Sequence, residues 1–448
     1  MNVGKRVANI GIPFLLGNRR GHAVALLLLY LLLLMEYYGF AYSNYFSLMG
    51  FDYRFNPVAF LSGLLMLAAA VAMLAAIPGD KGRLYTVGVV VAMLFCLPQI
   101  VLFQIGKAQP YGALYSLLLL FLVTTPLLRL PQARTPRLPA RWLWWLLPLL
   151  AVLALIPFVN AYGLSFNLHR FTLGQDIYQA RAAASARGTT VTDYLLGPLT
   201  RLMLPLMLVY GLCRLRRRWW MVVLALAMTL YLFFITPQKT ILFSLGLVAV
   251  CFFFRNNFAK AGMLLYGLLL LCATAVALRL AAHAVMPESI VVRRLFFIPA
   301  IVQENYFSFF EQNPVYLSHS FLSGLFDYPY QLDPPHLIGQ MMYNRATTSC
   351  NTGVTGDGFM NFGHAGAFLF TAVAALLIRL VDSTGYDSRY IGLVAVLMLT
   401  FLNGALCTTL HTHGGLLLIV AFFFLVPAES RGYSSSNQPQ KQCNEVAF

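Results

Sequence analysis

Residues 22–42 read HAVALLLLYLLLLMEYYGFAY, a stretch with a single acidic side chain, Glu36, and no lysine or arginine. A helix rises about 1.5 Å per residue, so a stretch of this length can cross the hydrocarbon core of a bilayer. It lacks a small-residue cleavage site of the kind that ends a signal peptide. We therefore expect it to be retained as a membrane span.

Stretches of this kind recur along the whole chain. Hydrophobic residues make up 59% of the 448 residues and charged residues 10%, whereas a soluble protein carries about 25% charged residues. This composition predicts an all-α polytopic integral membrane protein with about twelve transmembrane helices. The eighth, eleventh and twelfth are the shortest of the expected spans, which cover residues 22–42, 57–78, 84–105, 111–130, 142–162, 194–213, 219–236, 240–254, 261–283, 363–381, 390–406 and 414–427.

The net charge of +16 is distributed in a regular way. Every second connection is basic, as expected for loops that stay on the cytoplasmic side. With twelve spans, this pattern predicts that both termini lie in the cytoplasm. It also explains the positive net charge by membrane topology, so we expect no nucleic-acid partner. The tail at 430–448 is Ser- and Gln-rich, which predicts disorder, and 1–429 form one membrane domain. The residues that make these connections basic are Lys5, Arg6, Arg19, Arg20, Lys81, Arg83, Arg129, Arg134, Arg137, Arg141, Arg214, Arg216, Arg217, Arg218, Arg255, Lys260, Arg379 and Arg389.

Two longer segments fall on the opposite, outer side, at about 163–193 and 284–362. The first contains GQDIYQARAAASARG at 174–188, whose alanines predict a short helix at about 176–186 that carries Arg181 and ends near Arg187. The second begins with PESIVVRRLFFIPAIVQENYFSFFEQNP at 287–314.

The second segment predicts a helix that starts near Pro299, because proline suits the first helical turn. Its spacing indicates an amphipathic helix at the membrane interface, followed by a loop at 327–362. One face would carry Val302, Tyr306, Phe309 and Phe310, and Gln303, Glu304 and Gln312 would point elsewhere.

The outer side is unexpectedly basic. Arg293 and Arg294 run against topogenic preference there, and guanidinium groups match the oxygens of an anion such as a diphosphate. Lys239, in the tight turn after Pro237, is a second candidate phosphate ligand. Contact with lipid headgroups, or snorkelling in the case of the lysine, are the alternatives. The same two interpretations apply to the remaining outer arginines, Arg170, Arg181, Arg187, Arg201 and Arg279.

Several groups could act as a general base. Glu36, inside the first span, is a separate functional candidate. No Cys/His metal spacing and no nucleotide-binding pattern occur, so we expect neither a metal nor a cofactor. Cys350 and Cys407 both fall on the outer side, where a disulfide is possible. The candidate bases are Glu304, Glu311, Asp327, Asp333, His336, Asp357, His411 and His413.

A family resemblance emerges at NTGVTGDGFMNFGHAGAF, residues 351–368, which resembles the segment entering a late span of Wzy-type O-antigen and exopolysaccharide repeat-unit polymerases. RRLFFIPAIVQENYFSFFEQNP, at 293–314, is similar to the start of their long periplasmic loop. Arg345 and Gly356 fit the R-x10-G pattern of such loops. The first outer loop shows no such pair. The layout, with one long late extracytoplasmic loop, is similar over the whole chain.

The resemblance implies a metal-free, GT-C-like glycosyltransferase of the bacterial inner membrane that works on the periplasmic side. It would transfer a growing glycan from undecaprenyl diphosphate to a new lipid-linked repeat unit. The implied partners are that oligosaccharide, the bilayer, and also a chain-length regulator and a flippase. In this scheme Arg293, Arg294 and Lys239 hold the diphosphate, with Arg181 and Arg187 nearby and Arg345 positioning substrate. Glu304, His336 or Asp357 is the base, and Tyr306 borders lipid or sugar.

Two other functions share this layout. An O-antigen-ligase-like glycan transferase would join finished glycan to another acceptor. A flippase or transporter of lipid-linked oligosaccharide would place polar groups and broken helices near the midplane. The nearly charge-free spans favour an enzyme over a transporter.

Overall fold

The computed structural model describes residues 16–42, 50–128, 130–133, 135–164, 176–254, 256–320 and 322–429. These residues form helices and connections, with one isolated bridge between Tyr386 and Ala428. The predicted tail at 430–448 lies outside the described residues, as do Lys5, Arg6, Arg129, Arg134, Arg170 and Arg255. The all-α fold class is confirmed for the part of the chain that the structure describes.

Eight helical rods in the described residues are long and apolar enough to cross a membrane, and each overlaps an expected span. This confirms a polytopic membrane protein. The rods are Arg19–Tyr42, Pro57–Ala76, Gly82–Ile105, Trp142–Tyr162, Thr190–Cys213, Leu215–Ile235, Asn257–Ala282 and Val354–Ser383. The predicted loop at 327–362 is wrong in part, because a helix at Pro334–Tyr343 lies within it and the rod Val354–Ser383 begins within it.

The other four expected spans are shorter apolar helices: Tyr111–Thr124, Lys239–Phe253, Ser388–Asn403 and Gly415–Phe424. The fourth was expected to run to residue 130 but stops at Thr124. Pro126 explains the stop, because the residue before a proline avoids helical geometry. Thr125 accordingly has extended φ/ψ of −64° and 142°. The count of twelve spans stays a prediction.

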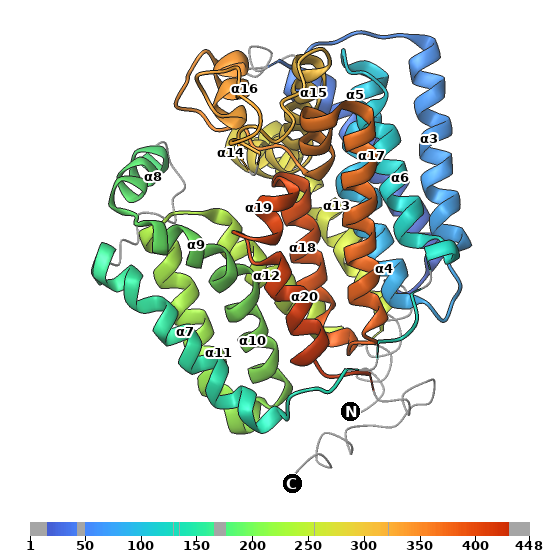
Figure 1. The fold of residues 1–448 in the computed structure, drawn as a ribbon. Coiled ribbons are helices and arrows are strands. Elements are labelled where there is room, and N and C mark those ends of the chain that lie inside the picture. Colours follow the sequence, from blue (N-terminus) through green and yellow to red (C-terminus); the bar gives the residue numbers. More distant parts are fainter. Residues whose placement is uncertain are drawn as a thin grey trace.

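Figure 1 labels the helices, which we name as drawn there. In chain order they are α2 (Arg19–Glu36), η1 (Tyr37–Tyr42), α3 (Pro57–Ala76), α4 (Gly82–Val91), η3 (Ala92–Cys96), α5 (Leu97–Ile105), α6 (Tyr111–Thr124), η4 (Pro126–Leu128), α7 (Ala140–Tyr162), α8 (Asp176–Arg187), α9 (Thr190–Pro198), η6 (Leu199–Met203), α10 (Leu204–Cys213), α11 (Leu215–Ile235), α12 (Lys239–Phe253), α13 (Asn257–Ala282), α14 (Val285–Glu288), η7 (Ser289–Phe297), α15 (Ile298–Phe310), α16 (Pro334–Tyr343), α17 (Val354–Ser383), η8 (Ser388–Tyr390), α18 (Ile391–Asn403), α19 (Leu406–Leu410) and α20 (Gly415–Phe424).

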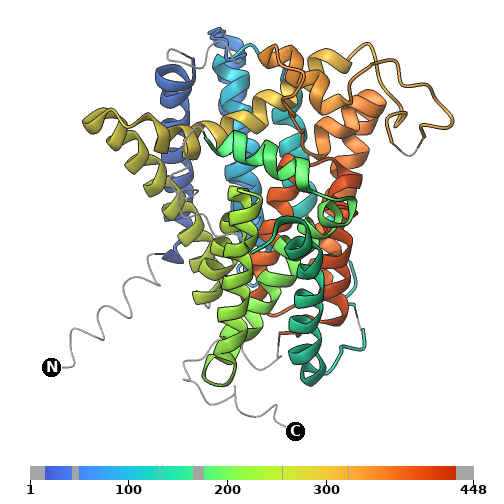
Figure 2. The ribbon, with the colours of Figure 1, turned by 90° about the vertical axis from the view of Figure 1, so that its left-hand side faces the viewer.

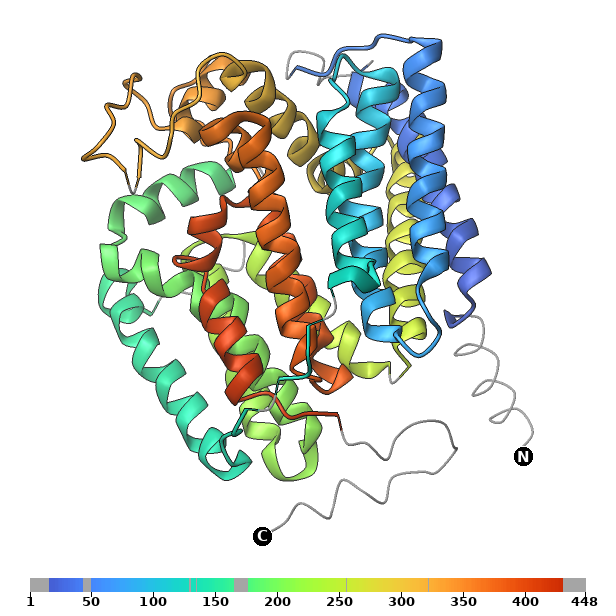
Figure 3. The ribbon, with the colours of Figure 1, turned by 45° about the vertical axis from the view of Figure 1, so that its right-hand side comes forward.

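The bundle has two different ends (Figure 1). One end, which we call the basic end, carries the connections α3–α4, α6–α7, α10–α11 and α17–α18. The other, the loop end, carries α8, α14, α15 and α16. Figure 3 shows the connection at 311–333 projecting from the loop end. The predicted helix at 176–186 is confirmed there as α8.

Arginines of the basic end bind the carboxyl-terminal carbonyls of neighbouring helices. Arg19 Nη2 donates to the carbonyls of Leu74 and Ala75 at 2.8 and 2.9 Å, where α3 ends. Arg137 Nη2 donates to Thr384 O at 2.6 Å, just past the end of α17. Helix carboxyl termini carry partial negative charge and unpaired carbonyls. These cations therefore also hold the helix ends together.

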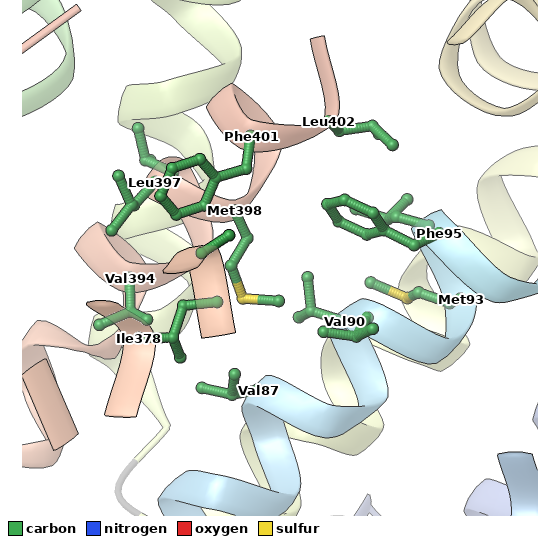
Figure 4. Packing of buried hydrophobic residues seen from close by; sticks show 14 of the residues in the cluster. Val87, Val90, Met93, Phe95, Ile378, Val394, Leu397, Met398, Phe401 and Leu402 are labelled. Carbon is green, nitrogen blue, oxygen red and sulfur yellow. The ribbon is translucent and has the colours of Figure 1, made fainter. Parts of the chain in front are cut away.

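The core lies around α4, η3 and α5, which together form the most deeply buried of the rods, Gly82–Ile105. A helix that is apolar on all sides belongs in the interior of a bundle. Side chains of this rod meet those of α17 and α18 (Figure 4). The interlocking residues include Val87, Val90, Met93, Phe95, Ile378, Val394, Leu397, Met398, Phe401 and Leu402.

Three helical rods share a local distortion. The π-helical stretches η3, η6 and η7 are each followed two residues later by a proline: Pro98, Pro205 and Pro299. A proline inside a helix lacks an N–H and clashes with the carbonyl four residues before it. The wider π turn removes that clash while the rod continues. Pro299 therefore continues a helix that is already present and does not start a new one.

The prediction that residues after Pro299 form an amphipathic helix exposed at the membrane interface is wrong. On α15 the face of Val302, Tyr306 and Phe310 is buried, but so are Gln303 and Glu304, at 7% and 6% exposed. The helix contacts α5, α6, α16 and α17, so neighbours cover both of its faces. Helical spacing alone does not reveal that the polar face is also covered.

Candidate functional site

Three of the predicted anion-binding residues lie together at the loop end. Arg181 is on α8, Arg294 is in η7 and Lys239 begins α12; all three are half-buried. Arg181 Nε donates to Pro237 O at 3.0 Å, which ties α8 to the turn between α11 and α12. Burial is the main factor that lowers the pKa of Lys239, and the nearby charges of Arg294 and Arg181 lower it further. We call these three residues the cation cluster.

In the view of Figure 2, α8 lies beneath the segment that contains η7. The amino terminus of α12 lies in the same place, and its N-cap residue, Gln238, makes no side-chain capping bond. A helix amino terminus has unpaired N–H groups and a partial positive charge. Three cations at the positive end of a helix favour the binding of negatively charged groups. The arrangement therefore suits a multiply charged anion such as a diphosphate.

Arg293 lies apart from this cluster, although it is adjacent to Arg294 in the sequence. It is buried, at 6% exposed, and its Nε and Nη2 contact Ser289 Oγ at 3.1 and 2.9 Å. Successive residues of a helical stretch point in different directions, so the two arginines do not act as one pair. Arg294 joins the cluster and Arg293 supports the first turn of η7.

Asp357, a candidate base, occupies a structural position. It lies in the first turn of α17 and is 3% exposed. Its Oδ2 accepts a hydrogen bond from Leu406 N at 2.8 Å, and its Oδ1 accepts one from Asn361 Nδ2 at 3.1 Å. Both oxygens are engaged, and the carboxylate joins α17 to α19.

Glu304 is buried on α15 and only partly satisfied. Its Oε1 accepts a hydrogen bond from Gln109 N at 2.9 Å, whereas its Oε2 is buried and has no hydrogen-bond partner in the described part of the chain. Burial raises the pKa of this carboxyl from 4.5 to about 7, opposed by the Gln109 bond. A base with a pKa near neutrality is well suited to catalysis. The Glu304 carboxylate is bound by the α5–α6 connection.

Glu304 predicts a pH dependence of stability. Its folded-state pKa lies above its ordinary value, so the folded protein holds this proton more tightly than the unfolded chain does. Stability is then greatest below about pH 4.5 and falls as the pH rises through about 7. We expect Glu304→Gln to reduce the loss of thermal stability between pH 5 and pH 8 in detergent. Asp327→Asn, at an exposed carboxylate, is the control; equal losses in wild type and Glu304→Gln contradict the prediction.

His336 is the accessible candidate base. It lies on α16, and its Nδ1 is 2.5 Å from Oδ1 of Asp333, the N-cap residue of that helix. The His336 side chain is 37% exposed. A carboxylate that hydrogen-bonds one ring nitrogen fixes the ring and leaves Nε2 available to take a proton.

The remaining predicted residues are dispersed. Tyr306 is buried, and its hydroxyl donates to Cys350 O at 3.0 Å, so it supports the loop from inside. Arg187 is exposed at the end of α8, and Arg345 is exposed just after α16. Cys350 and Cys407 are free thiols, so the possible disulfide does not form in the structure.

No protein-family model, curated protein or solved structure matches this chain. The functional proposal therefore rests on the local geometry of the site and on the sequence resemblance. Across the described residues, no three His, Cys, Asp or Glu side chains gather where they could hold a metal ion.

The sequence analysis missed one buried charge network. Arg279 Nη2 donates to both carboxylate oxygens of Glu36, at 3.1 and 3.3 Å, and its Nε donates to Glu288 Oε2. Arg279 is thus engaged with two carboxylates, not with a substrate phosphate. Burial raises the pKa of Glu288. We call Arg279, Glu36 and Glu288 the charge triad.

Proposed function

We propose that this protein polymerises lipid-linked oligosaccharide repeat units at the periplasmic face of the bacterial inner membrane. It would transfer a growing glycan from undecaprenyl diphosphate to a new lipid-linked unit. The observation that carries the proposal is the cation cluster: Arg181, Lys239 and Arg294 come from three distant segments and meet at an uncapped helix amino terminus. The resemblance of 293–314 and 351–368 to Wzy-type polymerases supports the same conclusion.

The proposed reaction balances as a single displacement at the anomeric carbon. An acceptor hydroxyl forms the new C–O bond while the bond between that carbon and the diphosphate oxygen breaks. The acceptor proton passes to a protein base, and the diphosphate leaves with an added negative charge. Lys239, Arg294 and Arg181 stabilise that charge as it develops, which is where fixed cations contribute most to rate.

His336 is the base that the geometry supports best. It lies on α16 at the loop end (Figure 1), is accessible, and is oriented by Asp333. Asp357 is a poor candidate for the base, because both of its carboxylate oxygens already accept hydrogen bonds from the protein. Glu304 remains the second candidate, because its Oε2 is unpartnered but buried.

The direct test is incubation of the purified full-length protein with lipid-linked repeat units, followed by separation of the glycans on a gel. A polymerase converts single units into a ladder of lengths. A ligase leaves single units unextended and moves finished glycan to another acceptor. A transporter makes neither product but moves the lipid-linked unit across vesicle membranes. Either of the last two results rejects the proposal.

We expect His336→Gln to lower the rate of ladder formation by about 10²–10⁴-fold, the usual contribution of a general base. Asp333→Asn should lower kcat less, with little change in KM, because it only orients the ring. His283→Asn is the matched control: His283 is exposed at the loop end, and its φ of 53° is one that asparagine tolerates. Wild-type rates in His336→Gln assign the base elsewhere, first to Glu304.

A further inference from the structure

Three buried polar atoms face one small cavity away from the cation cluster. Arg201 Nη1, Thr409 Oγ1 and His413 Nδ1 are all buried and make no hydrogen bond within the described part of the chain. Their residues line the same cavity, whose volume is about 10 Å³. Thr409 is fully buried, at 0% exposed. Buried polar atoms are almost always paired in folded proteins, so three unpaired ones around one space indicate a missing occupant.

Helix breaks bring these atoms together. Arg201 belongs to η6, the π-helical stretch between Pro198 and Pro205. Thr409 belongs to α19, and His413 lies in the turn before α20. Gly414, with a φ of 77°, is the N-cap residue of α20, and it lines the cavity with Gly415. The free N–H groups at the start of this ten-residue helix therefore lie at the cavity.

The residues that line the cavity are closely packed as well as polar. A Cβ atom on Gly404 would lie 2.8 Å from Thr409 Oγ1 and 3.3 Å from His413 Cε1. The backbone at residue 404 therefore packs directly against two of the three residues. The cavity has room for one small molecule or monatomic ion, and it is narrow for a tetrahedral phosphate group.

The charge of the cavity is positive. Burial, and then the nearby Arg201 charge, lower the pKa of His413 to about 3, so its ring is neutral at physiological pH. Neutral imidazole still donates from Nδ1 when the proton is on that nitrogen. Arg201 forms no ion pair with any residue that the structure describes. A guanidinium, a hydroxyl, an imidazole N–H and a helix amino terminus thus surround the space without a carboxylate.

We infer that this cavity binds one small monatomic anion, with chloride as the physiological ligand. A water molecule would satisfy the donors but leave the charge of the half-buried Arg201 guanidinium, whose Nη1 is buried, without a counter-ion. An anion satisfies both requirements. It would tie η6 to the α19–α20 turn, independently of any glycan chemistry.

The test compares thermal unfolding of the full-length protein in detergent, in sodium chloride and in sodium gluconate at equal ionic strength. Gluconate is too large for the cavity. We expect chloride and bromide to raise the midpoint by a few degrees in a saturable manner, because a ligand that binds only the folded state stabilises it. Bromide should also give an anomalous scattering peak beside Arg201 in crystals.

Arg201→Gln should abolish the halide response, and Arg54→Gln, at an exposed arginine of the loop end, should retain it. If Arg201→Gln does not fold, Thr409→Val keeps the charge but removes one donor, and should shift the response to several-fold higher chloride. Equal midpoints in chloride and gluconate for the wild type mean that the cavity holds water only, which overturns the inference. A larger effect of phosphate than of chloride also overturns it.

Discussion

Replacement of both Lys239 and Arg294 by methionine is expected to reduce repeat-unit polymerisation by roughly 10³-fold or more. Each cation that stabilises a leaving charge contributes about 10²–10³ in rate when it acts in a preorganised site. Arg181 and the amino terminus of α12 would remain, so residual activity is expected. Methionine preserves much of the apolar length of both side chains, so packing changes little.

The measurement is the rate of ladder formation by purified variants, with midpoints of thermal unfolding taken alongside. Lys107→Met is the matched control, because Lys107 is also at the loop end but is 70% exposed and paired with Asp52 at 3.7 Å. Single variants at Lys239 and Arg294 should be intermediate and non-additive, since both would contact one diphosphate. A double variant that inserts, folds and polymerises at the wild-type rate would falsify the cluster as the diphosphate site.

Arg279→Met is expected to be the most destabilising single substitution at the loop end. It leaves Glu36 and Glu288, which are 6% and 0% exposed, without their cation. Removing one partner of a buried ion pair costs about 3–5 kcal/mol, because the remaining charge stays buried and unpaired. In a domain of this size the midpoint of thermal unfolding should fall by about 5 °C or more.

The charge triad also predicts a rescue. Glu36→Gln and Glu288→Gln, added to Arg279→Met, remove the two orphaned carboxylates and should restore most of the lost midpoint. The measurement is a thermal scan of single, double and triple variants in one detergent, read as a mutant cycle. Arg279→Met with a wild-type midpoint, or a triple variant less stable than Arg279→Met alone, contradicts the assignment of these three residues to one network.

The candidate site was only partly predictable. Excess positive charge on the predicted outer side indicates an anion site at Arg294 and Arg181, and the cost of a lysine in an apolar hairpin indicates one at Lys239; the structure brings these three together. The same reasoning chose Arg293, which the structure turns toward Ser289, and Arg279, which it pairs with Glu36. A charge pattern shows that cations are present on one side of the membrane. It does not show which protein groups each of them contacts in the fold.

The sequence by itself determined the membrane class, the positions of the eight long rods, the short helix α8 and the segregation of basic connections to one end. These features follow from hydropathy, helix propensity and charge summed over neighbouring residues, so a linear sequence contains them. Only the tertiary structure decided that Arg279 meets Glu36 across 243 residues, that Asp357 is fully engaged, and that Arg201 and His413 share a cavity. Those outcomes depend on which helix faces which, and a contact between distant segments leaves no periodic signal in either of them.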